Sequence, residues 1–371
     1  MANAIRALAM DAVEAAKSGH PGMPMGMADV ATVLFGEVMR YDASDPAWPN
    51  RDRFVLSAGH GSMLLYALLY LTGAPGMTLD EIKRFRQLGS KTAGHPEYGH
   101  APGIETTTGP LGQGLANAVG MALGERIWNA RLGNVIDHHT WVIAGDGCLQ
   151  EGISQEAISL AGHLGLGKLV VIWDDNSISI DGPTSLSTSE DQVARFKAAG
   201  WNTTAIDGHD TGAIKIALER AKTDPSKPWL IAAKTTIGFG APTKAGKASS
   251  HGSPLGADEI KGARERLGWS HGAFEIPDAV LQAWRTAGAR GRSSREAWTA
   301  QWAKIAAPTR AAFADPSSGA AGEAIRAAVK EAKTTAAAET AKKATRQWSE
   351  AALEKLVPAC PALIGGSADL T

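Results

Sequence analysis

Short apolar runs recur along the chain, and polar turns that contain glycine or aspartate separate them. We predict five of these runs as buried strands: Arg53–Ser57, Thr140–Ala144, Lys168–Trp173, Thr203–Ile206 and Trp229–Lys234. Continuous apolar runs of this length are typical of strands that are buried on both faces of a parallel sheet. The pattern therefore indicates a central parallel sheet.

Longer segments with helical spacing of apolar residues lie between these runs. The predicted helices are Ala2–Lys17, Met25–Met39, Met63–Leu71, one that begins near Pro110, Ile153–Leu164 and Thr211–Lys222. Strands that alternate with helices form right-handed crossovers and pair in parallel. We therefore expect an α/β fold, with a doubly wound, mostly parallel sheet that helices flank.

The pattern changes in the last quarter of the chain. From Ser270 to Lys343 the sequence is mostly polar and helical, and its Ala/Lys/Glu/Thr-rich part, Ala320–Ala344, has little to bury. We predict a large domain over residues 1–316, a helical linker over 317–344 and the start of another domain over 345–371. The last of these ends in a strand-like stretch, Ala362–Leu370. The Lys-, Gly- and Ser-rich segment Lys244–Ser253 is expected to be a functional loop.

Composition narrows the class of protein. Hydrophobic residues make up 44% and charged residues 20% of the 371 residues, and the formal net charge is −1. This balance indicates neither nucleic-acid nor membrane binding, so a local basic cluster must meet any anionic substrate. Cys148 and Cys360 lack metal-ligand spacing, and the chain has no signal-peptide core and no membrane-spanning run. We expect a cytoplasmic protein.

Polar residues follow two neighbouring strands at the point where each strand ends. Gly145-Asp146-Gly147 follows the second predicted strand, and Asp175-Asn176 follows the third. The carboxyl ends of parallel strands share one rim, where open α/β sheets bind ligands. Carboxylate and amide oxygens suit Mg²⁺, and glycines beside a helix N-terminus suit a diphosphate. A lone GDG is more often a structural turn, but Asn176, thirty residues after Asp146, favours a binding site.

This pattern resembles the thiamine-diphosphate fingerprint, and other motifs resemble the transketolase family specifically. These motifs run through nearly the whole chain in the family's order: Ser18–Gly22, Gly59–Ser62, Gly94–Glu97, Thr106–Gly114, Gly145–Gly152, Asp207–Asp210, Lys234–Gly240 and Ser250–Gly256. The resemblance implies a thiamine-diphosphate-binding fold.

The resemblance also implies an activity and partners. Transketolases reversibly transfer a two-carbon ketol unit from a ketose phosphate to an aldose phosphate, in the pentose phosphate pathway and the Calvin cycle. The implied cofactors are thiamine diphosphate and Mg²⁺, for which Ca²⁺ or Mn²⁺ are possible substitutes. The implied assembly is a homodimer with active sites at the subunit interface.

Individual site residues carry over from the matching motifs. The implied metal ligands are Asp146, Asn176 and the backbone carbonyl of Ile178. The residues implied at the cofactor are His60, Gly109, Pro110, Leu111, Gly147, Glu151, Asn176, His251 and Asp369. Glu151 is equally compatible with capping the helix that follows it.

Four of the ten histidines lie in loops flanked by glycine or proline: His20, His60, His95 and His251. Imidazoles of near-neutral pKa can move the protons of substrate hydroxyls and donate hydrogen bonds to oxyanions. The resemblance assigns His20, His95 and His251 to catalysis and substrate binding, and Arg346 to the sugar phosphate. We interpret His100 as a loop residue, and the others that we weighed as structural: His138, His139, His163 and His271.

Several alternatives stay open. Dihydroxyacetone synthase has nearly the same motifs, whereas His20, His95, His251 and Arg346 disfavour deoxyxylulose-phosphate synthase and phosphoketolase. The family's cofactor-activating Glu lies beyond Thr371. We therefore expect a fragment that is inactive alone, rather than one chain of a split enzyme. An alternative from another functional class is a non-catalytic module that binds the cofactor and needs a second chain.

Overall fold

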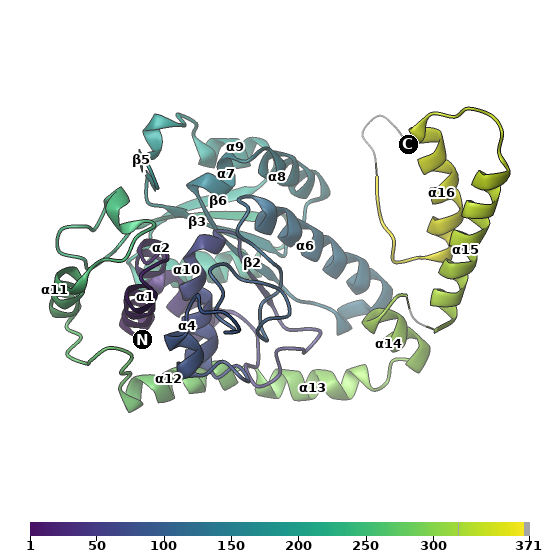
Figure 1. Ribbon diagram of the computed structural model, residues 1–371. Coiled ribbons are helices and arrows are strands. Elements are labelled where there is room, and N and C mark those ends of the chain that lie inside the picture. The colour runs from purple at the N-terminus through teal and green to yellow at the C-terminus, as the bar shows by residue number, and fades with distance from the viewer. Residues whose placement is uncertain (318, 367–371) are drawn as a thin grey trace. The chain divides into compact units, whose positions relative to one another are not determined.

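The computed structural model describes residues 1–317 and 319–366 and divides into two compact units, Met1–Trp298 and a unit from Thr299 onward. A five-stranded sheet forms the centre of the first unit (Figure 1). All of its strands are parallel, and their order is β1 (Arg53–Leu56), β2 (Thr140–Gly145), β3 (Leu169–Asp175), β7 (Trp229–Lys234) and β6 (Asn202–Asp207). The five predicted strands and the parallel α/β fold are confirmed.

Helices cover both faces of this sheet. The chain crosses the sheet in one direction from β1 through β2 and β3 to β6, and then returns to β7. Right-handed crossovers therefore place opposite layers on its two faces. One layer contains α6 (Gln113–Leu132), α8 (Gly152–Leu164) and α9 (Gln192–Ala198). The other contains α10 (Thr211–Thr223), α3 (Ala28–Val33), α1 (Ala2–Ala16), α4 (Ser62–Thr72) and α12 (Asp278–Ala289).

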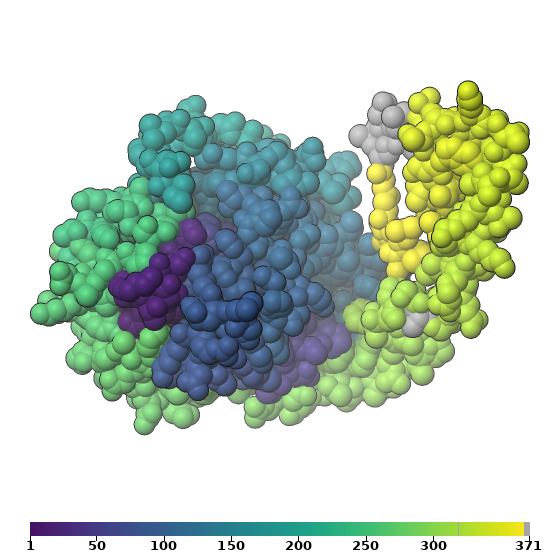
Figure 2. Space-filling model, in the orientation of Figure 1, coloured from purple at the N-terminus to yellow at the C-terminus, as the bar shows by residue number. Residues whose placement is uncertain are grey.

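The N-terminal helix α1 belongs to the core of the first unit. Its apolar residues Ile5, Leu8 and Val13 are fully buried, so the helix is stabilised mainly by packing. In Figure 2, α1 (purple) lies between the blue segment that holds α4 and the green segment that holds α11 (Ala257–Leu267), both of which it contacts. Asp11 of α1 accepts two hydrogen bonds from Arg264 of α11, at 2.8 and 2.9 Å.

The prediction of one continuous helix over Met25–Met39 is wrong. The structure has α2 (Gly22–Gly26), then α3, and then a π-helical turn at Leu34–Val38. Gly26 lies against the backbone of Thr236, where a Cβ atom would be 2.9 Å from the carbonyl oxygen. A distant segment thus packs against the chain next to the interruption, a contact that the local apolar pattern does not predict.

Some short elements of the first unit lie outside the sequence prediction. They are α5 (Leu79–Lys83), α7 (Asp146–Gln150), α11, and a two-stranded hairpin of β4 (Ile178–Ser179) and β5 (Gly182–Pro183). The helix expected near Pro110 begins at Gln113, after Gly112 in a left-handed conformation. The predicted loop Lys244–Ser253 contains only one short 3₁₀ turn, Ala248–Ser250.

The second unit is helical over the residues that the structure describes. It contains α14 (Ala307–Ala314), α15 (Gly319–Ala338) and α16 (Thr345–Ala359), while α13 (Arg292–Trp302) spans the boundary. Helices α15 and α16 pack together, with an ion pair between Lys355 and Glu331 at 2.9 Å. The Ala-rich stretch is thus a helix as far as Ala338, and the domain bounds at residues 316 and 344 stay predictions.

Two further predictions concern the strand near the C-terminus and membrane-spanning segments. Residues 363–366 do not form the predicted strand, and the rest of that stretch lies outside the described residues. Across the described part of the chain, every helix is too short or too polar to cross a bilayer.

Candidate functional site

A cavity of about 140 Å³ opens at the carboxyl ends of β2 and β3, at the rim where the sequence predicts a binding site. Several segments contribute to its wall, and the lining residues that matter below are His60, Leu111, Asp146, Gly147, Asp174, Asn176, Ile178 and His251. Seven of these eight carry predicted roles, and Asp174 is the addition. The order of the strands thus brings distant motifs to one place.

Asp146 sits where β2 ends and α7 begins, so it lies at a helix N-terminus. The indole Nε1 of Trp173 donates a hydrogen bond to Asp146 Oδ1 at 3.2 Å. Burial, with the nearby carboxylates of Asp174 and Asp175, raises the pKa of Asp146 to about 7. The nearby positive charge of Lys234 lowers this pKa only in part, so burial and negative charge dominate around the carboxyl group.

Asn176 and Ile178 follow β3 in a tight turn. Ser177 between them has φ of 63°, a left-handed conformation that turns the chain back to the rim. The amide oxygen of Asn176 accepts a hydrogen bond from the backbone nitrogen of Ile178 at 2.9 Å. Its Nδ2 donates to Asp174 Oδ2 at 2.8 Å. The turn therefore fixes both ends of the Asn176 amide.

The charges around the cavity fit a divalent cation. Asp175 has Lys234 at 3.3 Å, but neither Asp146 nor Asp174 has an ion pair among residues 1–317 and 319–366. Burial raises the pKa of Asp174 to about 6. A cation would relieve the cost of two buried carboxylates so placed.

The donor set also fits Mg²⁺ in particular. In the described part of the chain, three or more His, Cys, Asp or Glu side chains never gather as a metal cluster. The ligands that the resemblance implies, Asp146, Asn176 and the carbonyl of Ile178, stay a prediction, and they comprise one carboxylate, one amide oxygen and one backbone carbonyl. That set leaves positions for water and phosphate oxygens, as Mg²⁺ prefers.

Two glycines pack closely against the segments next to the cavity. Gly109 has φ of 139°, and a Cβ atom there would lie 3.1 Å from the His95 ring. A Cβ atom on Gly59 would lie 2.5 Å from the hydroxyl of Thr108. Pro110 and Leu111 continue this segment, and Leu111 lines the cavity beside Gly147. Only glycine suits these two positions.

The structure brings the four loop histidines together. The rings of His60 and His251 stack, with centroids 4.9 Å apart and planes at 20°. The ring of His20 lies 5.2 Å from His60, 5.6 Å from His251 and 6.4 Å from His95, again between centroids. Four histidines that lie far apart in the sequence thus form one polar cluster in the structure.

Burial keeps these imidazoles neutral. It lowers the pKa of His60 to about 3 and that of His20 to about 4, and the neighbouring His251 adds to both shifts. Burial also lowers the pKa of His95 and of His251. Nδ1 of His20 and Nδ1 of His251 are buried without a hydrogen-bond partner among the described residues. Each of these two imidazoles thus has a buried ring nitrogen that no described residue uses.

Arg86 is a site residue that the sequence prediction missed. Its guanidinium donates to Ser18 Oγ at 2.9 Å, two residues before His20, and its positive charge contributes to the lowered pKa of His95. Its Nε is buried with no partner in the part of the chain that the structure describes. Arg86 lies in an ordinary polar stretch of sequence, and only the folding of two loops together reveals it.

The remaining predicted residues do not line this cavity or lie outside the described part of the first unit. Glu151 is exposed and precedes α8, without a side-chain capping bond. Arg346 is an exposed residue of α16 in the second unit, and Asp369 lies outside the described residues. His100 is exposed beside Glu97, at 3.2 Å. Of the histidines interpreted as structural, His138 is buried and His163 is exposed.

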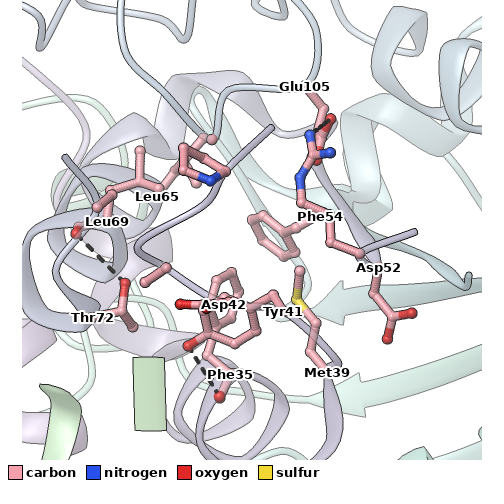
Figure 3. Close-up of a pocket in the computed structure, with 15 residues that line it drawn as sticks. Phe35, Met39, Tyr41, Asp42, Asp52, Phe54, Leu65, Leu69, Thr72 and Glu105 are labelled. Atoms are coloured by element: carbon pink, nitrogen blue, oxygen red, sulfur yellow. Dashed lines mark hydrogen bonds and ion pairs between the residues drawn. The ribbon is translucent and has the colours of Figure 1, made fainter. Parts of the chain in front are cut away.

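A second cavity in the first unit has a different character (Figure 3). It lies near the amino end of β1, and its wall is largely apolar, with Phe35, Phe54 and Leu65. Its wall also contains Arg51 and Glu105, whose side chains form an ion pair with each other at 2.8 Å. Ligands of open α/β sheets bind at the opposite, carboxyl ends of the strands. We therefore assign function to the first cavity.

Comparisons with known proteins show which family this chain resembles. A family model described as the thiamine diphosphate binding domain of transketolase matches residues 1–324. A transketolase from Cereibacter sphaeroides is 60% identical over all of this chain and 56% of its own length. Transketolase 1 from Vibrio cholerae is 53% identical, over all of this chain and 56% of its own length. The chain thus spans about half the length of the curated relatives that it matches.

Solved structures give the same result. A transketolase from Leishmania mexicana superposes with a TM-score of 0.85 at 44% identity, covering 99% of this chain and 55% of its own. A transketolase from Pichia stipitis, in complex with sedoheptulose-7-phosphate, superposes with a TM-score of 0.85 at 42% identity, with the same coverage.

Proposed function

This chain belongs to the transketolase family, and we propose that it forms the part of a transketolase that binds the metal and the cofactor diphosphate. The proposed reaction of the whole protein is transfer of a two-carbon ketol unit from a ketose phosphate to an aldose phosphate. One observation supports it most: four neutral histidines converge beside the Asp146–Asn176 rim. The sugar phosphate bound by the Pichia stipitis relative supports the substrate class.

The proposed binding roles follow from the walls of the cavity. Asp146, Asn176 and the carbonyl of Ile178 would hold Mg²⁺, for which Ca²⁺ or Mn²⁺ could substitute. Gly147, His60 and His251 would contact the diphosphate, with Gly109, Pro110 and Leu111 beside the rings. Thiamine diphosphate, when bound, supplies the stabilisation of a carbanion that ketol transfer requires.

The proposed roles of the histidines follow from their neutral state. A neutral imidazole has one N–H that can donate a hydrogen bond to a substrate oxygen and one ring nitrogen that can accept a hydrogen bond from a hydroxyl. His20, His95 and His251 would do so for the sugar, because their rings share one wall. Arg346 would meet the anionic phosphate group, as the family resemblance implies.

Several properties of the whole protein belong to the same proposal. We propose that it forms a homodimer, with Glu151 and Asp369 near the shared interface. We also propose a place in the cytoplasm and in sugar-phosphate metabolism of the pentose phosphate or Calvin type. The free state of Cys148 and Cys360 supports a reducing compartment.

The metal site can be tested by replacing Asp146 with alanine. We expect Asp146→Ala to abolish Mg²⁺-dependent binding of thiamine diphosphate, measured by isothermal titration calorimetry, because the substitution removes the only carboxylate proposed as a metal ligand. Asp181→Ala is the matched control, since Asp181 is an exposed aspartate in the nearby hairpin turn. Undiminished binding by Asp146→Ala would mean that the metal lies elsewhere.

A further inference from the structure

Strand β3 ends with two consecutive aspartates, and these differ in burial and in ion pairing. Successive side chains of a strand point to opposite faces of the sheet, so Asp174 and Asp175 face different layers. Asp175 is 25% exposed and pairs with Lys234 at 3.3 Å. Asp174 is 1% exposed, and no lysine or arginine pairs with it among the described residues. A carboxylate buried in this way needs other partners.

Asp174 uses both of its oxygens to hold neighbouring side chains. Oδ2 accepts the hydrogen bond from Asn176 Nδ2 at 2.8 Å, and Oδ1 accepts one from the hydroxyl of Thr235. Thr235 directly follows β7, which pairs in parallel with β3 in a register that sets Asp175 opposite Lys234. The register of the sheet therefore places the Thr235 hydroxyl beside Asp174.

Thr235 is itself held from the other side. The next residue, Thr236, donates its backbone N–H to His209 Nε2 at 3.0 Å, and His209 Nδ1 lies 2.9 Å from Asp29. The segment after β7 is thus fixed at two successive residues.

The contact with Asp174 determines which end of the Asn176 amide faces the cavity. An amide has a donor end and an acceptor end, and only the oxygen can bind a cation. A flipped amide would place Nδ2 against the N–H of Ile178 and Oδ1 against the Asp174 carboxylate. Both arrangements are repulsive. Since Oδ1 accepts only the Ile178 N–H, one of its lone pairs stays open.

We propose that Asp174 is a positioning residue, which fixes the amide of Asn176 so that its oxygen faces the divalent cation, and that Thr235 holds Asp174 in place. This inference rests on the proposed function and deepens it, because it names the partners behind a metal ligand. Removal of such outer partners typically weakens metal affinity by about 10- to 100-fold.

The test measures the affinity of the chain for Mn²⁺ in the presence of saturating thiamine diphosphate. Free Mn²⁺ is counted by electron paramagnetic resonance. We expect Asp174→Ala to raise the Kd for Mn²⁺ by about 10- to 100-fold. We expect Thr235→Val, which keeps the shape but loses the hydroxyl, to raise it by a smaller factor, and Thr235→Ser to restore the wild-type value.

Asp175→Ala is the matched control, because it removes the same charge one residue further along. Asp175 is partly exposed and already paired, so we expect its loss to change the Kd by about threefold or less. Equal Kd values for Asp174→Ala and Asp175→Ala would overturn the inference, since charge alone would then explain the effect.

Thermal unfolding of each variant separates positioning from stability. If Asp174→Ala fails to fold, the two Thr235 variants decide, and equal Kd values for Val and Ser would overturn the inference. A wild-type chain that binds no Mn²⁺ with the cofactor would overturn the proposed function and this inference together.

Discussion

At the scale of single residues, sequence motifs predict the side chains that form the site, but not the residues that orient them. His20, His60 and His251 stand in recognisable loops, and the structure brings them together. Arg86 and Asp174 lie in stretches with no such signal, because their roles depend on contacts with Ser18 and Thr235. Local sequence patterns therefore predict which side chains form the site, whereas the orientation of these side chains depends on tertiary contacts.

Gly109 provides a prediction at this scale. Gly109→Ala strains a backbone with φ of 139° and places a Cβ atom 3.1 Å from the ring of His95. Gly99→Ala is a matched control, because Gly99 has φ of 88° and no neighbour within 4 Å. We expect both variants to lose about 1 kcal/mol of unfolding free energy from backbone strain. Only Gly109→Ala should also weaken cofactor binding in calorimetry, and equal binding by the two variants would contradict this.

At the scale of elements, the strands were predictable and the broken helix was not. Apolar runs such as Thr140–Ala144 are buried on both faces of the sheet, so their own sequence decides their structure. Met25–Met39 has an equally apolar pattern, yet its helix is interrupted at Met27, next to the point where Gly26 lies against Thr236. The short helix α7 was missed because five residues carry too weak a periodic signal.

His209 links several elements, and its loss is expected to loosen them. Its ring bridges Asp29 of α3 and the backbone N–H of Thr236 after β7, while Asp29 also binds Arg6 of α1 at 2.5 Å. His209→Gln removes this geometry and should lower the unfolding free energy by roughly 1–3 kcal/mol.

Chemical denaturation of His209→Gln measures this loss, with His163→Gln as the control. His163 is an exposed histidine at the end of α8, so its replacement should leave the unfolding free energy within about 0.5 kcal/mol of wild type. A loss of the same size in both variants would contradict a stabilising role for the hydrogen bonds of His209.

At the scale of the whole molecule, buried histidines and buried carboxylates act on stability in opposite directions. Burial lowers the pKa of His20 to about 4, of His60 to about 3 and of His138 to about 2. The unfolded state therefore binds more protons at these sites below pH 6.5, and their stabilisation is lost as the pH falls. Asp146 and Asp174, with raised pKa values of about 7 and about 6, gain protons in the folded state instead.

In all, six imidazoles have a lowered pKa, against four carboxyl groups with a raised pKa, so we expect the ligand-free chain to lose stability between pH 6.5 and pH 4. Each histidine that stays neutral contributes about 1.4 kcal/mol per pH unit over this window. Thermal unfolding across this range measures the slope. His138→Gln, which lies outside the candidate site, should flatten the slope by about one proton. A midpoint that rises on acidification would contradict the prediction.

The strand order has a consequence for synthesis on the ribosome. β7 occupies the place between β3 and β6, yet it is made after both. Until it emerges, β6 has no partner, and β3 presents Val170, Val171 and Ile172 along an open, apolar edge. Roughly fifty residues separate β3 from β7, which at about 5–20 residues per second corresponds to several seconds. During that interval the nascent chain carries an unpaired edge of the kind that chaperones cover and that aggregation exploits.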